Sequence, residues 1–210
     1  MTKEEIIEES KICYDNCKLI ISGLGEITKE LDDSFDIAKA QTTFDMLLQS
    51  LMFSQAIADG NFCEEEKAFI TNISKDNDLF NNIDSEKLND LTWEKVFAMS
   101  SDKQKALSEE LNEILNRYAD DFVLPFAVLD AATTQNSLLD LSTQLTGLST
   151  LLASVDGELT EEEIDAFQAY SDDLIVGKWA DIKGLTEIIL EDPDNADDSD
   201  DSDDSENTEE

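Results

Sequence analysis

Apolar side chains recur every three or four positions along most of this chain, which is the spacing of one face of an α-helix. The pattern predicts helices over residues 3–22, 26–39, 44–57, 64–73, 85–99, 101–118, 138–155, 161–174 and 179–190. Gly23-Leu24-Gly25 is expected to end or kink the first helix, and Asp120-Asp121 to restart a helix near Pro125. Because no stretch keeps the alternation of a β-strand, the predicted fold class is all-α.

Two of these helices, over residues 44–57 and 138–155, are apolar on most sides and are therefore expected to lie inside the fold. Each stops at an Asp-Gly pair that begins the pattern Asp-Gly-x-apolar-x-x-x-Glu and opens the next helix. The motif residues in the two copies are Asp59, Gly60 and Glu66, and Asp156, Gly157 and Glu163.

The two copies also match outside the motif, at an offset of 97 positions. Leu51 falls on Leu148, and Ala56 falls on Ala153. One helix hairpin is therefore used twice, which predicts a pseudo-twofold arrangement. We expect residues 40–190 to form the main helical domain, with residues 1–39 as an N-terminal helical extension packed on it.

The physics of helix ends explains most of the motif. In each copy the glycine supplies a left-handed residue that ends a helix. In the second copy, Thr160 and Glu163 match a capping box, while Leu159 and Ile164 occupy the two positions of a hydrophobic staple. In the first copy Cys63 replaces the capping threonine and a lysine replaces the staple partner, so a weaker helix start is expected there.

A calcium-binding EF-hand loop is a second interpretation of the motif. With glycine at loop position six, the glutamate falls correctly at position twelve. Position one would then be Gln55 in the first copy and Leu152 in the second. Position three would be Ile57 in the first copy and Ser154 in the second. Neither Ile57 nor Leu152 has a side-chain oxygen to coordinate calcium, so neither copy is predicted to be a working EF-hand.

Two hypotheses stay open for the four acidic residues of the repeat, Asp59, Glu66, Asp156 and Glu163. In one, each caps backbone amides separately and is solvated by itself. In the other, the copies pack back to back and the four carboxylates converge. Carboxylates held close together repel each other, so a divalent cation, calcium, magnesium or manganese, would be their natural counter-charge.

Charge limits the classes of partner. The chain of 210 residues carries 51 acidic and 14 basic residues, for a formal charge of -37. Such a chain repels phosphate backbones and anionic membrane surfaces, so we expect no nucleic-acid binding. Cations and basic protein partners are favoured. The C-terminal residues 191–210 hold 12 of the acids and no Lys, Arg or aromatic residue, which predicts a disordered acidic tail.

The missing residue types narrow the chemistry further. There is no histidine, which excludes Ser-His and Cys-His nucleophile activation. No glycine-rich loop is present to cradle a phosphate, so no enzymatic activity is predicted. Cys13 and Cys17 lie four apart on one helix face, either as small apolar fillers or as a redox pair. The odd cysteine count, the charged N-terminus and the short apolar runs predict a cytoplasmic protein without a membrane span.

An apolar helix ending in Ala-Asp-Gly, followed by x-apolar-x-x-x-Glu opening the next helix, resembles the tellurite-resistance TerB family. The residues that carry the resemblance are Ala58, Asp59, Gly60 and Glu66, and Val155, Asp156, Gly157 and Glu163. The family shares a fold with the N-terminal domain of the DjlA co-chaperone. The resemblance covers residues 40–190 and implies a single all-helical domain of about seven core helices with an internal repeat. The chain departs from the family pattern at Val155, where the family prefers alanine.

The resemblance implies a bacterial stress-response role, tellurite resistance included, for a binding or scaffold module that is not an enzyme. It also implies that the paired acids bind a metal. The alternative function is a protein-interaction or co-chaperone-type module without a metal. Such a module would use its helical surface and acidic tail to bind a basic protein partner.

Overall fold

The structure, a computed structural model of the chain, describes residues 1–73, 78–157 and 160–191. These residues form nine α-helices and no strand, which confirms the all-α prediction. The helices are Lys3–Leu31 (α1), Ile37–Ala56 (α2), Glu64–Ile73 (α3), Leu79–Asn82 (α4), Trp93–Phe97 (α5), Ser101–Thr133 (α6), Ser137–Ala153 (α7), Glu161–Leu174 (α8) and Val176–Glu191 (α9). The acidic tail from residue 192 lies outside the described residues.

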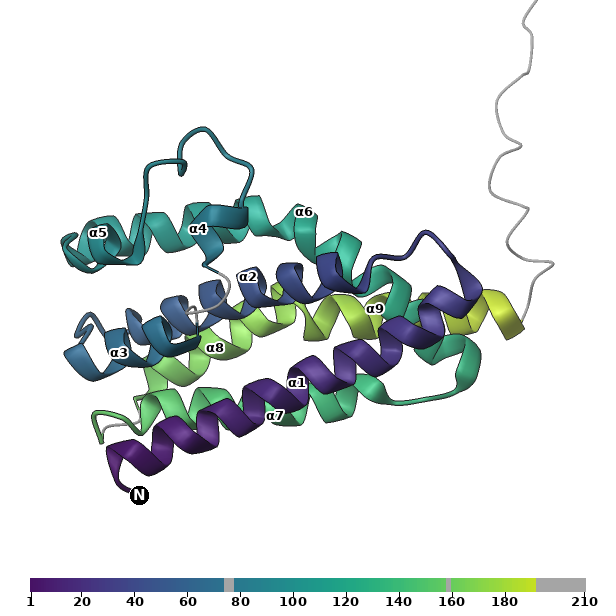
Figure 1. Cartoon of the computed structure of the whole chain (residues 1–210), viewed down its shortest axis with the longest axis horizontal. Helices are drawn as coiled ribbons and strands as arrows, with labels where there is room; N and C mark the ends of the chain where they lie inside the picture. Colours follow the sequence, from purple (N-terminus) through teal and green to yellow (C-terminus); the bar gives the residue numbers. More distant parts are fainter. Residues whose placement is uncertain (74–77, 158–159, 192–210) are drawn as a thin grey trace, which may run out of the picture.

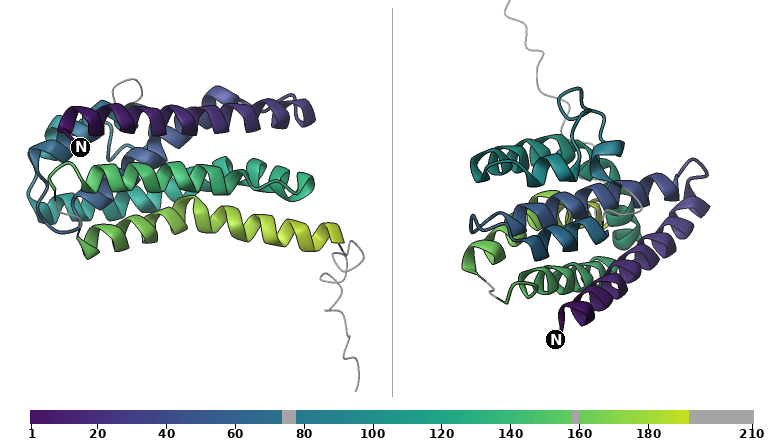
Figure 2. Two further views of the ribbon diagram at one scale, coloured as in Figure 1. Left: turned by 90° about the horizontal axis from the view of Figure 1, so that it is seen from below. Right: turned by 60° about the vertical axis from the view of Figure 1, so that its left-hand side comes forward.

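The long helices lie side by side in one bundle (Figure 1). Helix α2 is central and packs against α1, α6 and α8, and every residue from Thr43 to Ile57 is buried. α1 packs along α7, and α6 packs along α9. The α2–α3 and α7–α8 turns lie at one end of the bundle, which we call the corner end. The α1–α2 turn, the α6–α7 turn and the end of α9 lie at the opposite end (Figures 1 and 2).

Both tryptophans of the chain are held in the core by the same device. The indole N–H of Trp93 donates to Oε1 of Gln49 over 3.3 Å, and that of Trp179 donates to Oδ2 of Asp130 over 3.1 Å. Each acceptor also receives the backbone N–H of a leucine at the start of a nearby helix. These two fully or nearly buried acceptors therefore join segments that are far apart in sequence.

The break predicted at Gly23–Gly25 is wrong, because α1 continues through it to Leu31. Leu24 and Gly25 are buried, and a Cβ built on Gly25 would lie 2.9 Å from Cγ1 of Ile37. The glycine therefore allows α1 to approach α2 closely, and this packing outweighs its poor helix propensity of about 1 kcal/mol.

The helix predicted over residues 85–99 is mostly wrong. Residues 85–91 form successive turns, in which the amide of Leu88 donates to the carbonyl of Ser85 and that of Leu91 to the carbonyl of Leu88. Only Trp93–Phe97 is helical. The apolar side chains of this segment reach the core from successive turns. Their spacing in the sequence therefore looks like that of one helix face, although residues 85–91 form no helix.

The restart predicted at Asp120-Asp121 is also wrong, since α6 is a single helix of 33 residues. It passes through Pro125 and bends in this region (Figure 1). Phe122 and Phe126 on either side of the proline are buried, and their rings pack edge to face on each other at 5.4 Å. Phe126 also packs on Phe35 of the α1–α2 turn at 5.5 Å, and Phe122 packs on Phe44 of α2 at 6.0 Å. Tertiary packing therefore compensates for the hydrogen bond that proline removes.

The prediction of no membrane span was tested on the described helices, and none of them combines the length and the apolar character that a membrane crossing needs.

Candidate functional site

The two Asp-Gly corners are neighbours at the corner end of the bundle (Figures 1 and 2). Helix α2 leads into the first and α7 into the second, and the two helices contact each other. The side-chain amide of Gln55 on α2 donates to the carbonyl of Ser149 on α7 over 2.9 Å. Two turns separated by 97 residues are thus placed side by side.

Each corner is built on a left-handed glycine, as the sequence predicts. Gly60 has φ of 85° and Gly157 has φ of 91°. Residues with a Cβ rarely adopt this conformation, so glycine is required for the helix to turn back here. In the first corner, Oδ1 of Asp59 accepts the amide N–H of Asn61 at 2.7 Å, which closes a local Asx turn.

The second corner contains the predicted capping box. The hydroxyl oxygen of Thr160 accepts the amide N–H of Glu163 at 3.2 Å. In return, Oε2 of Glu163 accepts the amide N–H of Thr160 at 2.9 Å and also the Thr160 hydroxyl at 2.9 Å. The staple partner Leu159 lies outside the described residues. The carboxylate of Glu163 is therefore a structural part of the start of α8.

The first corner has the same reciprocal pair, with sulfur in place of the hydroxyl. Oε2 of Glu66 accepts the amide N–H of Cys63 at 2.7 Å, and the amide of Glu66 donates to Sγ of Cys63 at 3.4 Å. The ammonium of Lys67 lies 5.5 Å from the centre of the Phe62 ring, a cation–π contact where the second copy has an apolar residue. The first corner thus has a cap in which sulfur, a weaker acceptor than oxygen, takes the place of the hydroxyl, and the weaker helix start expected there stays a prediction.

The four acids form one electrostatic group. Glu66 and Glu163 are each only 2 % exposed, whereas Asp59 and Asp156 are exposed. Burial raises the pKa of Glu66 to about 7, and repulsion from Asp156 and Glu163 adds to this. Burial likewise raises the pKa of Glu163, with further repulsion from Asp156 and Asp59. The structure thus brings the four predicted site residues close enough to interact.

The two buried glutamates of this group hydrogen-bond to backbone amides. Each buried glutamate uses one oxygen on its own helix cap. Among the described residues, no group of three or more Cys, Asp or Glu side chains is placed so that it could hold a metal ion. The capping hypothesis therefore has direct support in hydrogen bonds, and cation binding by these acids stays a prediction.

The three cysteines are free thiols. Burial raises the pKa of Cys17 to about 12 and that of Cys63 to about 11, and it also raises the pKa of Cys13. The thiolate is the reactive form, so these thiols are poor nucleophiles near neutral pH.

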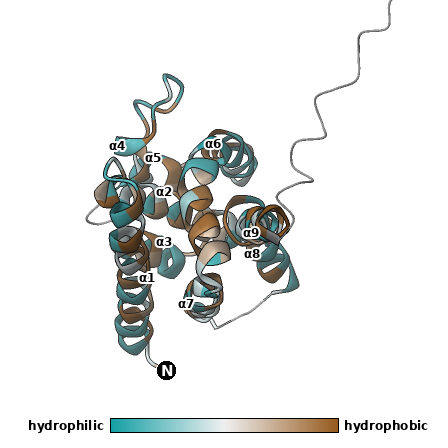
Figure 3. Cartoon of the chain, turned by 90° about the vertical axis from the view of Figure 1, so that its right-hand side faces the viewer, coloured by the Kyte–Doolittle hydropathy of each residue, from teal (hydrophilic) through white to brown (hydrophobic). Residues whose placement is uncertain are grey.

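A set of exposed apolar side chains at the opposite end of the bundle was not found by sequence reasoning. They come from the last turns of α1, the second half of α6, the start of α7 and the last turns of α9. Figure 3 looks onto this end of the bundle, with α1 on one side, α9 on the other and α6 and α7 between them. We call this surface the apolar end; its residues are Ile27, Leu31, Leu124, Val128, Leu139, Leu185, Ile188, Ile189 and Leu190. Helical periodicity places them on helices, but only the bundle shows that none of the described helices covers them.

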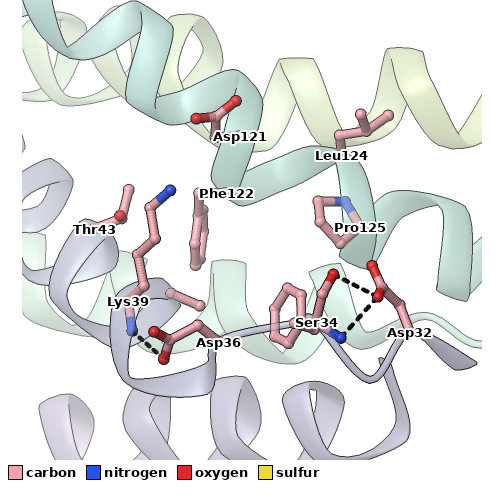
Figure 4. A pocket seen from close by; sticks show the side chains of 11 residues that line it. Asp32, Ser34, Asp36, Lys39, Thr43, Asp121, Phe122, Leu124 and Pro125 are labelled. Atoms are coloured by element: carbon pink, nitrogen blue, oxygen red, sulfur yellow. Dashed lines mark hydrogen bonds between the residues drawn. The ribbon is translucent and has the colours of Figure 1, made fainter. Parts of the chain in front are cut away.

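A pocket of about 370 Å³ lies close to this surface, between the α1–α2 turn and the bend of α6 (Figure 4). Its wall includes Asp32, Phe35, Lys39, Asp121, Phe122 and Pro125. These residues come from segments about 80 positions apart, so no local motif marks the pocket in the sequence.

Comparison with protein-family models, curated proteins and solved structures finds no match to this chain. Membership of the TerB-like family therefore stays a prediction, as do the predicted domain boundaries at residues 39 and 190.

Proposed function

We propose that this chain is a non-enzymatic binding module that holds a basic protein partner against its apolar end. The observation that carries the proposal is the gathering of exposed apolar side chains at one end, immediately before the acidic tail in the sequence. Leu185 is 62 % exposed and Ile188 is 65 % exposed, one turn apart on α9. Exposed apolar side chains that recur on one helix face mark interaction sites in soluble proteins when they form a patch.

Charge selects the class of partner. The chain carries a formal charge of -37, and 12 acidic residues follow within residues 191–210. An acidic partner would be repelled, and a basic one would be steered to the surface at an increased association rate. The apolar residues then supply the desolvated centre of an interface, with the acids as its polar rim.

The proposal assigns no catalysis to the chain. It has no histidine, its thiols have raised pKa values, and the two buried glutamates at the corners each hold a helix cap. The thiols are therefore mostly protonated near neutral pH, and each glutamate already uses one oxygen to hold backbone.

Site-specific photo-crosslinking tests the proposal. A photoreactive amino acid is placed at Leu185 or Ile188 in the full chain, and at Leu19 as a control that is 69 % exposed in the middle of α1. We expect a basic protein to be captured at the first two positions and not at the third. The purified partner should bind more weakly as salt rises. Equal capture at Leu19, or capture of acidic proteins only, would contradict the proposal.

A divalent cation at the corner acids is a second candidate function, and it would agree with the stress-response role that a TerB-like module implies. The specific observation in its favour is the mutual repulsion of Glu66, Asp156 and Glu163, which a cation would relieve. Calorimetric titration with calcium, magnesium and manganese tests it. Heat or a thermal shift that Asp156→Ala removes would support the site, and identical behaviour of both proteins would exclude it.

A further inference from the structure

The pocket near the apolar end has an apolar wall and a charged rim. Phe35 and Phe122 contribute aromatic surface, and Pro125 lies across from Ser34 (Figure 4). Its volume of about 370 Å³ lies at the lower end of the range for ligand sites, roughly 300–1,000 Å³. The pocket therefore has room for one long side chain and not for a folded element.

The charged residues of the pocket favour a cation. Three aspartates, Asp32, Asp36 and Asp121, line it together with one basic residue, Lys39. Asp32 accepts two hydrogen bonds from Ser34 through Oδ1, and Asp36 caps the amide of Lys39 over 3.0 Å, also through Oδ1. In both, the second carboxylate oxygen is left for a ligand. Among the described residues, neither Asp121 nor the ammonium of Lys39 has an ion-pair partner.

The proline adds an acceptor on the same wall. In a regular helix the carbonyl of residue 121 would accept the N–H of residue 125, but Pro125 has no N–H. The carbonyl oxygen of Asp121, next to the pocket, thus lacks the donor that residue 125 would supply in a regular helix. A ligand that brings several N–H donors could satisfy this oxygen and the carboxylates together.

We propose that this pocket takes an arginine side chain of the basic partner, with the methylene stem against Phe35 and Phe122 and the guanidinium among the aspartates. The inference rests on the proposed function and adds the residue type that the partner presents. Arginine suits the site better than lysine because its planar guanidinium offers five donors and stacks on aromatic rings.

The test follows amide chemical shifts of the full chain as the peptide acetyl-Gly-Arg-Gly-amide is added. We expect saturable shifts at Phe35, Thr43 and Leu124, and none with the same peptide carrying neutral citrulline. Asp121→Asn should weaken binding about tenfold, since it removes a charge-assisted hydrogen bond. Lys39→Met should strengthen it severalfold by removing the like charge. Asp165→Asn, an exposed change of equal charge on α8, should leave the affinity unchanged.

Absence of pocket shifts, or equal affinities of Asp121→Asn and Asp165→Asn, would overturn the inference. Free agmatine is the second arm, and shifts with agmatine but not with the peptide would overturn the assignment to a protein side chain. If the peptide fails while photo-crosslinking at Leu185 still captures a basic protein, this inference is wrong and the proposed function stands. If the peptide binds as expected while no basic protein is captured, the proposed function is wrong.

Discussion

The two ends of the bundle use their polar and apolar side chains in opposite ways. At the corner end, Glu66 and Glu163 are buried acids, and each is engaged in the cap of the helix that it opens. At the apolar end, Leu185 and Ile188 are exposed, although their spacing on α9 is that of a buried face. At the corner end, carboxylates that repel each other are held close together because each caps a helix. At the apolar end, apolar side chains stay exposed to water.

This contrast between the two ends favours the apolar end as the binding surface. A conspicuous acidic motif marks the corner end, yet its hydrogen bonds are explained by the folding of two helix hairpins. The apolar end has no sequence motif, and its exposed side chains have no evident role in holding the fold together. Acidic residues whose hydrogen bonds already cap helices are weaker evidence for a ligand than apolar side chains that stay exposed to water.

The largest expected effect concerns Asp130, a buried hydrogen-bond acceptor near the apolar end. Its removal tests how much a buried polar contact stabilises that end compared with the capping glutamates of the corner end. Asp130, fully buried near the end of α6, accepts the indole N–H of Trp179 and the amide of Leu138. Asp130→Ala leaves two buried donors unpaired and should cost about 3 kcal/mol of unfolding free energy. Asp130→Asn retains an acceptor and should stay within about 1 kcal/mol of wild type. Equal losses in denaturant titrations would show that the acceptor is not the cause.

The second prediction concerns the buried acids of the corner end. Because the pKa of Glu66 is raised to about 7 from 4.5, its contribution to stability is present below pH 4.5 and is lost as pH rises through 7. Glu66→Gln keeps an oxygen for the amide of Cys63 and should melt roughly 5 °C above wild type at pH 8. The difference should shrink toward pH 4.5.

Glu163→Gln is the matched variant in the second corner. The pKa of Glu163 is also raised, so the change should have the same sign, and we expect it to be smaller than that of Glu66→Gln. Melting curves at pH 5, 6, 7 and 8 measure both variants. A difference from wild type that does not depend on pH would show that charge burial is not responsible.

The third prediction compares the two helix caps directly. Thr160→Ala removes a hydroxyl acceptor and should cost about 1 kcal/mol. Cys63→Ala removes a sulfur acceptor that lies 3.4 Å from the amide of Glu66, and it should cost less, about 0.5 kcal/mol. Chemical denaturation of both variants decides the order. A larger loss for Cys63→Ala would mean that packing of the sulfur matters more than its hydrogen bond.

The smallest expected effect on stability belongs to the apolar end. Leu185→Gln combined with Ile188→Gln should change the unfolding free energy by no more than about 0.5 kcal/mol, because both side chains are exposed and glutamine favours helices. The same variant should lose the basic partner, while Leu19→Gln should bind it normally. A strongly destabilised double variant would mean that these residues support the fold and are not a free surface.

Much of the corner end follows from local sequence. The left-handed glycines at 60 and 157 and the capping box of Thr160 with Glu163 depend on residues within a few positions of each other, and all were predicted. The weaker helix start expected at Cys63 stays a prediction, because it depends on how closely the sulfur approaches the amide of Glu66, a distance that local sequence does not give. The electrostatic coupling of the four acids was foreseen as one of two hypotheses, and the distances that produce it are tertiary.

Prediction failed where distant segments decide local structure. α1 runs through Gly25 because Ile37 packs against it, and α6 runs through Pro125 because its Phe122 and Phe126 pack on rings of α2 and of the α1–α2 turn. The apolar end and its pocket are invisible in the sequence for the same reason. An apolar residue at helical spacing has the same pattern whether a neighbouring helix covers it or not, and only the packing of the bundle distinguishes Leu185 from a core leucine.

Short-range interactions thus specify that this chain is helical, where its hairpins turn, and which residues cap them, since caps, left-handed glycines and periodicity act over a few residues. Long-range packing decides which helices join, which acids repel, and which apolar side chains stay in water. The physical reason is that burial depends on the whole arrangement of neighbours around a side chain, while a helix end depends on one turn of backbone.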